Sequence, residues 1–295
     1  MSQAERLNRL VAKHFPGARL NAFEPLTGGV SADVTRLDLV MPDGEDRSVV
    51  LREHGERHSG HSITVECAIL TRLHAAGLRV PELLASDDTG AIIKQPWMMM
   101  EFVEGSTHIP MKEADHRIEA MAHNLLTIHA LPLDGLRDLP RILDPIPELL
   151  AWLSDETRWS RLRVRLQELE RAAYCEEPVF IHGDFWPQNI IWNDDATINA
   201  VIDWEDCGIG DPNADVAFSC LELRYEFGKE GAHRFKRAYA QSRKLDPFRI
   251  ALWQAYAGVH AYQHMGNWRL APEREEAMRN TAIASVDEAA EDIGA

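Results

Sequence analysis

The periodicity of the sequence changes once, near residue 104, and this change limits the folds open to the chain. The first hundred residues alternate strand-like and turn-like segments, of which 23–40 and 48–53 have the strongest β character. From Met111 onward the pattern becomes helical, apart from one β-rich island at 178–206. A β-rich part with one helix, followed by a mainly helical part, predicts an α+β fold with two lobes.

The lobe boundary is predicted at Glu104 and Gly105. Residues 1–104 are expected to form an antiparallel sheet with one helix at 63–76, and 105–295 a larger helical lobe. Two further strands are predicted in the first lobe, at 80–85 and 91–102. A length of 295 residues suits either two domains or one domain in two lobes. No 20–50-residue period repeats, which excludes solenoids and propellers.

The net charge argues against two classes of partner. With 31 basic and 47 acidic residues the formal charge is −16, and no basic patch is present. Nucleic acids and anionic membranes are therefore not expected partners. Residues 250–268 lack charged side chains but carry several polar ones, which indicates a buried or pocket-lining helix. The charged opening segment does not resemble a signal peptide, so a cytoplasmic location is expected.

The cysteines and clustered histidines show no metal-binding spacing. The four cysteines are far apart and contain no C-x-x-C pair, which indicates reduced thiols. His54, His58 and His61 lie close together in LREHGERHSGHS. Their spacing matches no common ligand pattern, so a solvated loop is predicted there rather than a metal site.

The most informative segment is HGDFWPQN, followed shortly by VIDWE. Asp184 and Asn189 lie five residues apart, and Asp203 ends the next hairpin. One carboxylate plus two oxygen ligands for a hard divalent cation is the combination that phosphoryl transfer requires. The alternative is that both aspartates simply occupy a loop and a turn, where this residue type is common.

These two motifs resemble the aminoglycoside phosphotransferase and choline kinase family, whose members have a protein-kinase-like fold with a small β-rich lobe and a larger helical lobe. The resemblance implies Mg²⁺-dependent transfer of the γ-phosphoryl group of ATP or GTP to a small-molecule hydroxyl. It assigns Asp184 to orienting the hydroxyl and accepting its proton, and Asn189 and Asp203 to binding Mg²⁺. His182 would brace the loop, and Asp211 and Asp215 would be structural acids, the first ending a loop and the second capping the helix that begins near Ala214.

The same resemblance assigns nucleotide contacts in the first lobe. Arg52 in SVVLRE occupies the position of the family's basic residue, and Glu66 on the following helix would be its partner. The glycine pair in LTGGVSADV would contribute backbone N–H groups, and the hinge strand would contact adenine. The residues concerned are Gly28, Gly29, Val30 and Ser31 in the glycine segment, and Met100, Glu101 and Val103 in the hinge.

The acceptor is expected in the helical lobe, beside Asp184. Acidic groups would suit a cationic acceptor, and aromatic rings one with apolar faces. Each candidate also has a structural interpretation, and Trp204 is predicted to be core. The candidates are Trp186, Glu205, Asp206, Glu222, Tyr256, His260, His264 and Trp268.

Several alternatives remain open at the level of sequence. The acceptor could be an aminoglycoside, macrolide, choline, homoserine or sugar, and the protein a monomer or homodimer. VIDWE replaces D-F-G and no A-P-E segment follows, which argues against a protein substrate. A regulatory nucleotide-binding protein of the same fold, without transfer activity, is the alternative function.

Overall fold

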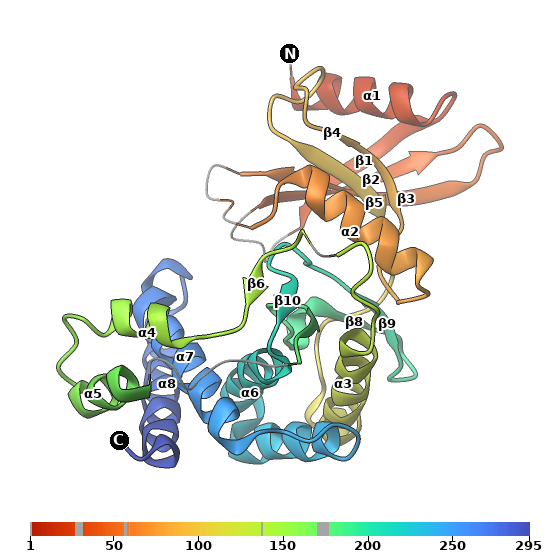
Figure 1. Cartoon of the computed structure of the whole chain (residues 1–295). Helices are drawn as coiled ribbons and strands as arrows, with labels where there is room; N and C mark the ends of the chain where they lie inside the picture. Colours follow the sequence, from red (N-terminus) through yellow and green to blue (C-terminus); the bar gives the residue numbers. More distant parts are fainter. Residues whose placement is uncertain (1, 27–31, 56–57, 59, 137, 170–176) are drawn as a thin grey trace. The chain divides into compact units, whose positions relative to one another are not determined.

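The computed structural model describes residues 2–26, 32–55, 58, 60–136, 138–169 and 177–295. The chain divides into two compact units (Figure 1). Unit 1 comprises Met1–Ser106 and Ile198–Glu205, and unit 2 comprises Thr107–Thr197 and Asp206–Ala295. Residues 198–205, predicted to lie in the helical part, belong instead to unit 1. They pack there because the Val201 N–H donates to the Arg79 carbonyl and the Asn199 amide donates to the Glu104 carbonyl, at 2.8 and 2.7 Å.

Unit 1 is built on a five-stranded antiparallel sheet in the order β1-β2-β3-β5-β4. The strands are β1 (Arg19–Leu26), β2 (Ala32–Val40), β3 (Asp46–His54), β4 (Leu83–Asp87) and β5 (Trp97–Glu101), and β9 (Ile198–Val201) also belongs to this unit. Side chains alternate across β3. Val49 and Leu51 therefore enter one buried core, while Arg52 and His54 share the opposite face.

Two helices cover the opposite faces of this sheet, α1 (Gln3–His14) and α2 (Ile63–Ala75) (Figure 1). The predicted helix at 63–76 is confirmed as α2, but α1 is a second helix, so the expectation of one helix in this part is wrong. The missed signal was a capping box, in which Ser2 and Glu5 bond each other's backbone N–H groups, followed by Leu7 and Leu10 at core spacing.

The predicted strands at 80–85 and 91–102 are displaced or too long. Pro96 has no N–H to donate, so β5 begins only at Trp97. The carbonyl of Pro96 instead accepts the His54 N–H at 2.9 Å. Lys94 is exposed and lies outside the strand. β4 begins two residues after Pro81, at Leu83.

Unit 2 is mainly helical. Its short strands β6 (Arg141–Ile142), β10 (Gly208–Gly210) and β7 (Val179–Ile181) form a sheet in that order, and β8 (Ile190–Trp192) follows the turn η2 (Pro187–Asn189). The sequence analysis did not predict β6 or β10. The remaining elements are η1 (Met111–Glu113), α3 (Ala114–His129), α4 (Ile146–Trp152), α5 (Ser160–Leu169), α6 (Pro212–Ala240), α7 (Pro247–His264), η3 (Met265–Asn267) and α8 (Pro272–Ile293).

The core of unit 2 explains the uncharged stretch in the sequence. Buried side chains of α7 pack with those of α4, α5 and α8, among them Leu252, Val259 and Val286. The prediction of a buried or pocket-lining helix at 250–268 is therefore confirmed for α7. Among the helices that the structure describes, none has the length and apolar character needed to cross a membrane.

Candidate functional site

The loop after β7 is fixed by a buried carboxylate on α6. Asp215 is fully buried and accepts the backbone N–H groups of His182 and Gly183 at 2.8 and 2.9 Å. It also lies 3.0 Å from the Nε2 atom of His129. Burial alone would raise the pKa of Asp215, but His129 and His182 together hold it below its ordinary value. Asp215 therefore acts as an ionised anchor for the loop.

This arrangement corrects one prediction about the two structural acids. Asp211, rather than Asp215, caps α6, where its side chain accepts the Asn213 N–H at 2.9 Å. Asp211 is buried and also contacts Arg249 and the Trp253 indole N–H, at 2.5 and 2.7 Å. The motif GDPNAD thus contains one helix cap and one loop anchor.

Gly183 is required by the shape of the loop. Its φ of +85° is in the left-handed region, and a Cβ at this position would lie 2.2 Å from the Asp206 carbonyl oxygen. His182 is buried, and its Nδ1 accepts the Asp184 N–H at 3.2 Å. His182 therefore braces the backbone that presents Asp184, as the sequence analysis expected.

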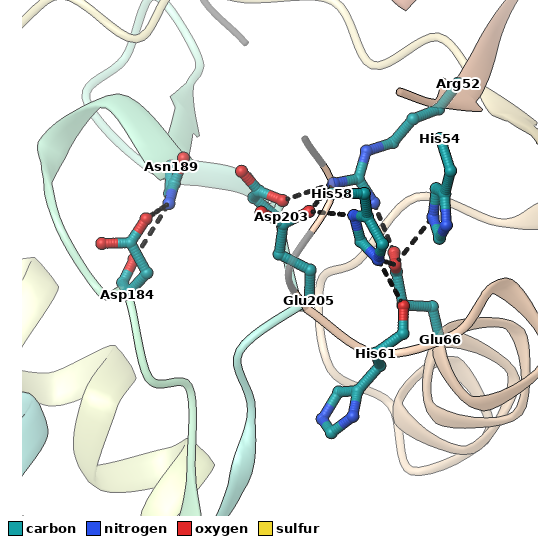
Figure 2. Close-up of polar contacts among 9 residues, drawn as sticks. All are labelled: Arg52, His54, His58, His61, Glu66, Asp184, Asn189, Asp203 and Glu205. Atoms are coloured by element: carbon teal, nitrogen blue, oxygen red, sulfur yellow. Dashed lines mark hydrogen bonds and ion pairs between the residues drawn. The ribbon is translucent and has the colours of Figure 1, made fainter. Parts of the chain in front are cut away.

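Asp184 and Asn189 are held together within unit 2 (Figure 2). The Asn189 Nδ2 donates to both the carbonyl and the Oδ2 of Asp184, at 2.9 and 3.0 Å. Asn189 is buried and Asp184 is half-buried. With its NH₂ turned to Asp184, the Asn189 carboxamide has its oxygen on the other side, where it can serve as a ligand for a hard cation.

A second polar cluster lies in unit 1, centred on Arg52 (Figure 2). Arg52 donates to Glu66 and Glu205 through short contacts, and to Asp203 Oδ1 at 3.1 Å. Burial alone would lower the pKa of Arg52, but Glu66, Asp203 and Glu205 outweigh it and raise the pKa. The guanidinium fork thus joins β3, α2 and the segment after β9.

The members of this cluster differ in exposure. The Arg52 and Glu66 side chains are 8% and 1% exposed, whereas that of Asp203 is 35% exposed. Asp203 has a φ of +64°, a conformation uncommon for a residue with a Cβ. Asp203 is thus the most accessible of these carboxylates. A side chain that binds an incoming cation has to be accessible in this way.

Glu205 belongs to unit 1 and joins the cluster around Arg52. Its carboxylate binds Arg52 and lies 3.3 Å from the Nδ1 of His58. The long sequence separation of 153 residues between Glu205 and Arg52 hid this contact.

The predicted solvated loop at His54, His58 and His61 is wrong for its first two histidines. His54 ends β3 and is buried, and the His58 side chain is only 12% exposed. Their rings stack with centroids 3.7 Å apart. The His54 Nε2 lies 3.0 Å from Glu66 Oε1. The spacing of the histidines in the sequence did not reveal the cluster of His54, His58 and Glu66, because Glu66 lies on α2.

The other predicted nucleotide contacts are in unit 1 or outside the described residues. Met100 and Glu101 end β5, and Met100 is half-buried opposite Val50 and Leu83. Val103 follows the strand and is also half-buried. The glycine segment, with Gly28, Gly29, Val30 and Ser31, lies outside the described residues.

Several predicted acceptor residues form an aromatic cluster on α7. The Tyr256 ring lies 4.8 Å from Trp152, and His260 stacks on Tyr256 with centroids 6.4 Å apart. His264 is 4.7 Å from His260. Burial, with a smaller effect of His264, lowers the pKa of His260 to about 4. His260 is therefore neutral near pH 7.

Acidic groups adjoin this aromatic cluster. The Tyr256 hydroxyl donates to Glu148 at 2.7 Å, and burial, with Glu148 and Asp206, raises the pKa of Tyr256. Asp206 itself is exposed. Sequence reasoning missed Trp152 and Glu148, because neither lies in or near a recognised motif.

The remaining acceptor candidates have different surroundings. Trp186 is half-buried next to η2, and among the described residues its Nε1 has no hydrogen-bond partner. Trp268 packs against a core that includes Leu221 and Met265, which favours its structural interpretation. Trp204 is buried, and the prediction that it belongs to the core is confirmed.

Comparison with known proteins identifies the family. The model of the phosphotransferase enzyme family matches residues 22–259, which is more than half of the chain. The chain belongs to the phosphotransferase enzyme family. The resemblance inferred from HGDFWPQN and VIDWE is therefore confirmed. Membership of this family supports transfer of a phosphoryl group from a nucleotide to a small molecule as the class of reaction.

Two proteins and one solved structure are similar to this chain. It is 30% identical over 197 residues to acyl-CoA dehydrogenase family member 10 of Mus musculus, covering 60% of this chain but only 18% of that protein. It is 25% identical over 182 residues to an aminoglycoside 3'-phosphotransferase of Niallia circulans, covering 57% and 67% of the two chains. A thermostable mutant of aminoglycoside phosphotransferase APH(4)-Ia, in complex with ADP and hygromycin B, has a TM-score of 0.67 at 17% identity, with 95% and 98% covered. The last likeness confirms the predicted protein-kinase-like α+β fold.

Glu222 on α6 gives a pH-dependent prediction. Burial first, and then the charges of Asp184 and Glu226, raise the pKa of Glu222 to about 8. The unfolded chain therefore loses this proton at lower pH than the folded chain, so stability falls as pH rises from about 4.5 to about 8. Glu222→Gln should raise the melting temperature relative to wild type at pH 8 more than at pH 5.

The control for this measurement is Glu276→Gln on α8, since Glu276 is exposed. Both variants are compared with wild type by thermal unfolding at each pH. A Glu222→Gln effect that is the same at pH 5 and pH 8 would contradict the raised pKa.

Proposed function

We propose that this protein transfers the γ-phosphoryl group of ATP or GTP to a hydroxyl group of a small molecule in a Mg²⁺-dependent reaction. The observation that carries this proposal is the bracing of Asp184, whose carboxylate and carbonyl both accept hydrogen bonds from Asn189. Family membership supports the reaction class.

Asp184 is proposed as the residue that orients the acceptor hydroxyl and takes its proton. Phosphoryl transfer needs little covalent work by the protein, so the position of this carboxylate matters most. Asp215 anchors the backbone on one side of Asp184, and Asn189 fixes the carboxylate on the other. These contacts hold the Asp184 carboxylate in its orientation before an acceptor binds.

Asn189 and Asp203 are proposed as the residues that would hold Mg²⁺. The ion would neutralise charge on the nucleotide phosphates during transfer. The donor set fits, because Mg²⁺ prefers carboxylate and carbonyl oxygens. Asp203 combines partial exposure with a fixed position, since Arg52 donates to its Oδ1.

Arg52 and Glu66 are proposed as the basic residue and partner that support nucleotide binding. Arg52 already donates to three carboxylates, so phosphate oxygens would compete with Asp203 and Glu205 for the same guanidinium. Met100, Glu101 and Val103 are proposed for the base, and the segment 28–31 for the phosphates.

The acceptor is proposed to be a small, cationic molecule that carries a hydroxyl group. Asp206, Glu148 and the ring of Tyr256 supply negative charge and aromatic faces within unit 2. His260, being neutral, adds no repulsion toward a cation. The cytoplasm is proposed as the location.

The Mg²⁺ assignment is tested by Asp203→Ala. This variant is expected to abolish the Mg²⁺-dependent part of nucleotide binding, measured by calorimetric titration of ATP and GTP with and without Mg²⁺. Asp194→Ala, which removes an exposed carboxylate, is the control and should bind as wild type. Binding by Asp203→Ala equal to wild type in the presence of Mg²⁺ would contradict the assignment.

A screen of hydroxyl compounds by ATP consumption separates the two candidate functions. A phosphotransferase should consume ATP with at least one compound and hydrolyse it slowly without any. A regulatory protein would bind nucleotide without turnover across the whole screen.

A further inference from the structure

Unit 1 holds a group of three metal-ligating side chains, of which the proposed transfer reaction uses only Glu66, as the partner of Arg52. His54 on β3, His58 in the following segment and Glu66 on α2 offer ligand atoms that all lie within 4.8 Å of one another. We propose that these residues bind a divalent transition-metal ion of the zinc class, at a site separate from the Mg²⁺ ligands Asn189 and Asp203.

The ligand atoms are buried and face polar neighbours at contact distance without a well-aligned hydrogen bond. His54 Nε2 lies 3.0 Å from Glu66 Oε1, and His58 Nδ1 lies 3.3 Å from Glu205. Among the residues that the structure describes, none of His54 Nε2, His58 Nδ1 and Glu66 Oε1 forms a hydrogen bond of normal geometry. Buried polar atoms in folded proteins are nearly always hydrogen-bonded. Two imidazoles that face carboxylates in this way are arranged as they would be around a shared cation.

The spacing of the atoms suits a zinc ion. In a tetrahedral site with bonds of about 2.0 Å, ligand atoms lie about 3.3 Å from one another. Glu66 Oε1 is 3.0 Å from His54 Nε2, and one ligand atom from each of the three residues lies within 4.8 Å of the others. Two imidazoles and one carboxylate are a common ligand set for zinc, with a fourth position open.

The local fold holds two of the ligands before any ion arrives. The alternation of β3 places His54 on the same face as Arg52, toward Glu66 in the first turn of α2 (Figure 2). Arg52 binds Glu66 through Oε2, which leaves Oε1 for His54 and His58. The hydrogen bond from Arg52 to Oε2 would hold Glu66 in place, as neighbouring hydrogen bonds commonly do for metal ligands in proteins.

The third ligand is positioned by its second ring nitrogen. The Nε2 of His58 lies 2.5 Å from the His61 carbonyl oxygen, and its Nδ1 lies 3.3 Å from Glu205. If Nε2–H donates to that carbonyl, Nδ1 is the nitrogen that can bind metal.

The surrounding charge favours a cation. Three carboxylates, those of Glu66, Asp203 and Glu205, surround the single guanidinium of Arg52. A dication would offset this excess of negative charge. Imidazole ligands favour Zn²⁺ or Co²⁺ over Mg²⁺, so this group should bind Zn²⁺ or Co²⁺ more tightly than Mg²⁺.

The test is metal titration of the full chain after treatment with a chelator. CoCl₂ and ZnCl₂ are titrated in the presence of excess MgCl₂, which saturates oxygen-ligand sites. Calorimetry gives stoichiometry and affinity, and the Co²⁺ absorption spectrum reports its coordination. Wild type is expected to bind one ion per chain, with a spectrum typical of tetrahedral or five-coordinate Co²⁺ with nitrogen ligands.

Variants assign the site. His54→Ala and His58→Ala should each lower the metal affinity by more than roughly 100-fold. Loss of a residue that only hydrogen-bonds to a metal ligand costs up to about that much. His61→Ala is the matched control, because its backbone carbonyl contacts His58 while its ring points away from Glu66 (Figure 2). It should bind as wild type, and circular dichroism checks that all three variants are folded.

Three results would overturn the proposal, and none depends on transfer activity. The first is the absence of stoichiometric Zn²⁺ and Co²⁺ binding by wild type. The second is wild-type affinity in the double variant His54→Ala, His58→Ala, and the third is a wild-type Co²⁺ spectrum typical of six oxygen ligands. If both histidine variants fail to fold, the wild-type Co²⁺ spectrum still decides, because a spectrum of six oxygen ligands excludes this group.

Discussion

Replacing Asp184 by asparagine is expected to lower kcat for phosphoryl transfer by about 10²–10⁴-fold, the usual contribution of a positioned acid or base. Asparagine has nearly the same size, and its oxygen can still accept the hydrogen bond from Asn189 Nδ2. It cannot take a proton from the acceptor hydroxyl. The affinity for Mg²⁺–nucleotide should therefore change little, because the change affects the acceptor step.

This prediction is checked by steady-state kinetics with an acceptor found in the ATP-consumption screen, together with calorimetric nucleotide titration. Asp194→Asn is the matched control, since it makes the same substitution at an exposed carboxylate. A kcat within a few-fold of wild type would remove Asp184 from the catalytic role. An equal loss of nucleotide affinity would indicate a structural effect on the loop.

Replacing Arg52 by alanine is expected to lower the free energy of unfolding by about 3–5 kcal/mol, as for other broken buried ion pairs. The Glu66 side chain is 1% exposed, and Arg52 is the cation that compensates it. Without the guanidinium, Glu66 is left as a buried charge, and Asp203 and Glu205 lose the donor they share. Nucleotide affinity should fall as well, because Asp203 is no longer held.

Urea unfolding gives the stability change from the shift in midpoint at constant slope. Arg52→Lys is the informative second variant. Lysine restores the charge but not the planar fork that reaches three carboxylates, so it should recover only part of the stability. A loss below about 1 kcal/mol for Arg52→Ala, the typical value for an exposed ion pair, would contradict the description of this cluster.

The sequence motifs predicted the parts of the site that are local in the chain. Asp184 and Asn189 are five residues apart, and the turn η2 between them brings Asn189 Nδ2 to the Asp184 carboxylate. The pair of Arg52 and Glu66 was also predictable, because a strand and the next helix carry them at the family's positions. Their contact is present in unit 1.

The parts that were not predictable depend on contacts between distant segments. Asp215 reaches back 33 residues to the His182 N–H, and no spacing rule distinguishes this anchor from a helix cap. Glu205 joins Arg52 across 153 residues. The segment with His54 and His58 is polar in sequence, but the register of β3 turns His54 inward.

The central claim is that Asp184 directs a nucleotide's γ-phosphoryl group onto a small-molecule hydroxyl. The most direct measurement incubates the protein and Mg²⁺ with ATP carrying ¹⁸O on its γ-phosphoryl group and a pool of cell metabolites, and detects products by mass spectrometry. Wild type is predicted to form at least one phosphomonoester that carries the label, and Asp184→Asn to form it far more slowly. Absence of labelled ester with wild type, or an equal rate of its formation with Asp184→Asn, would contradict the account.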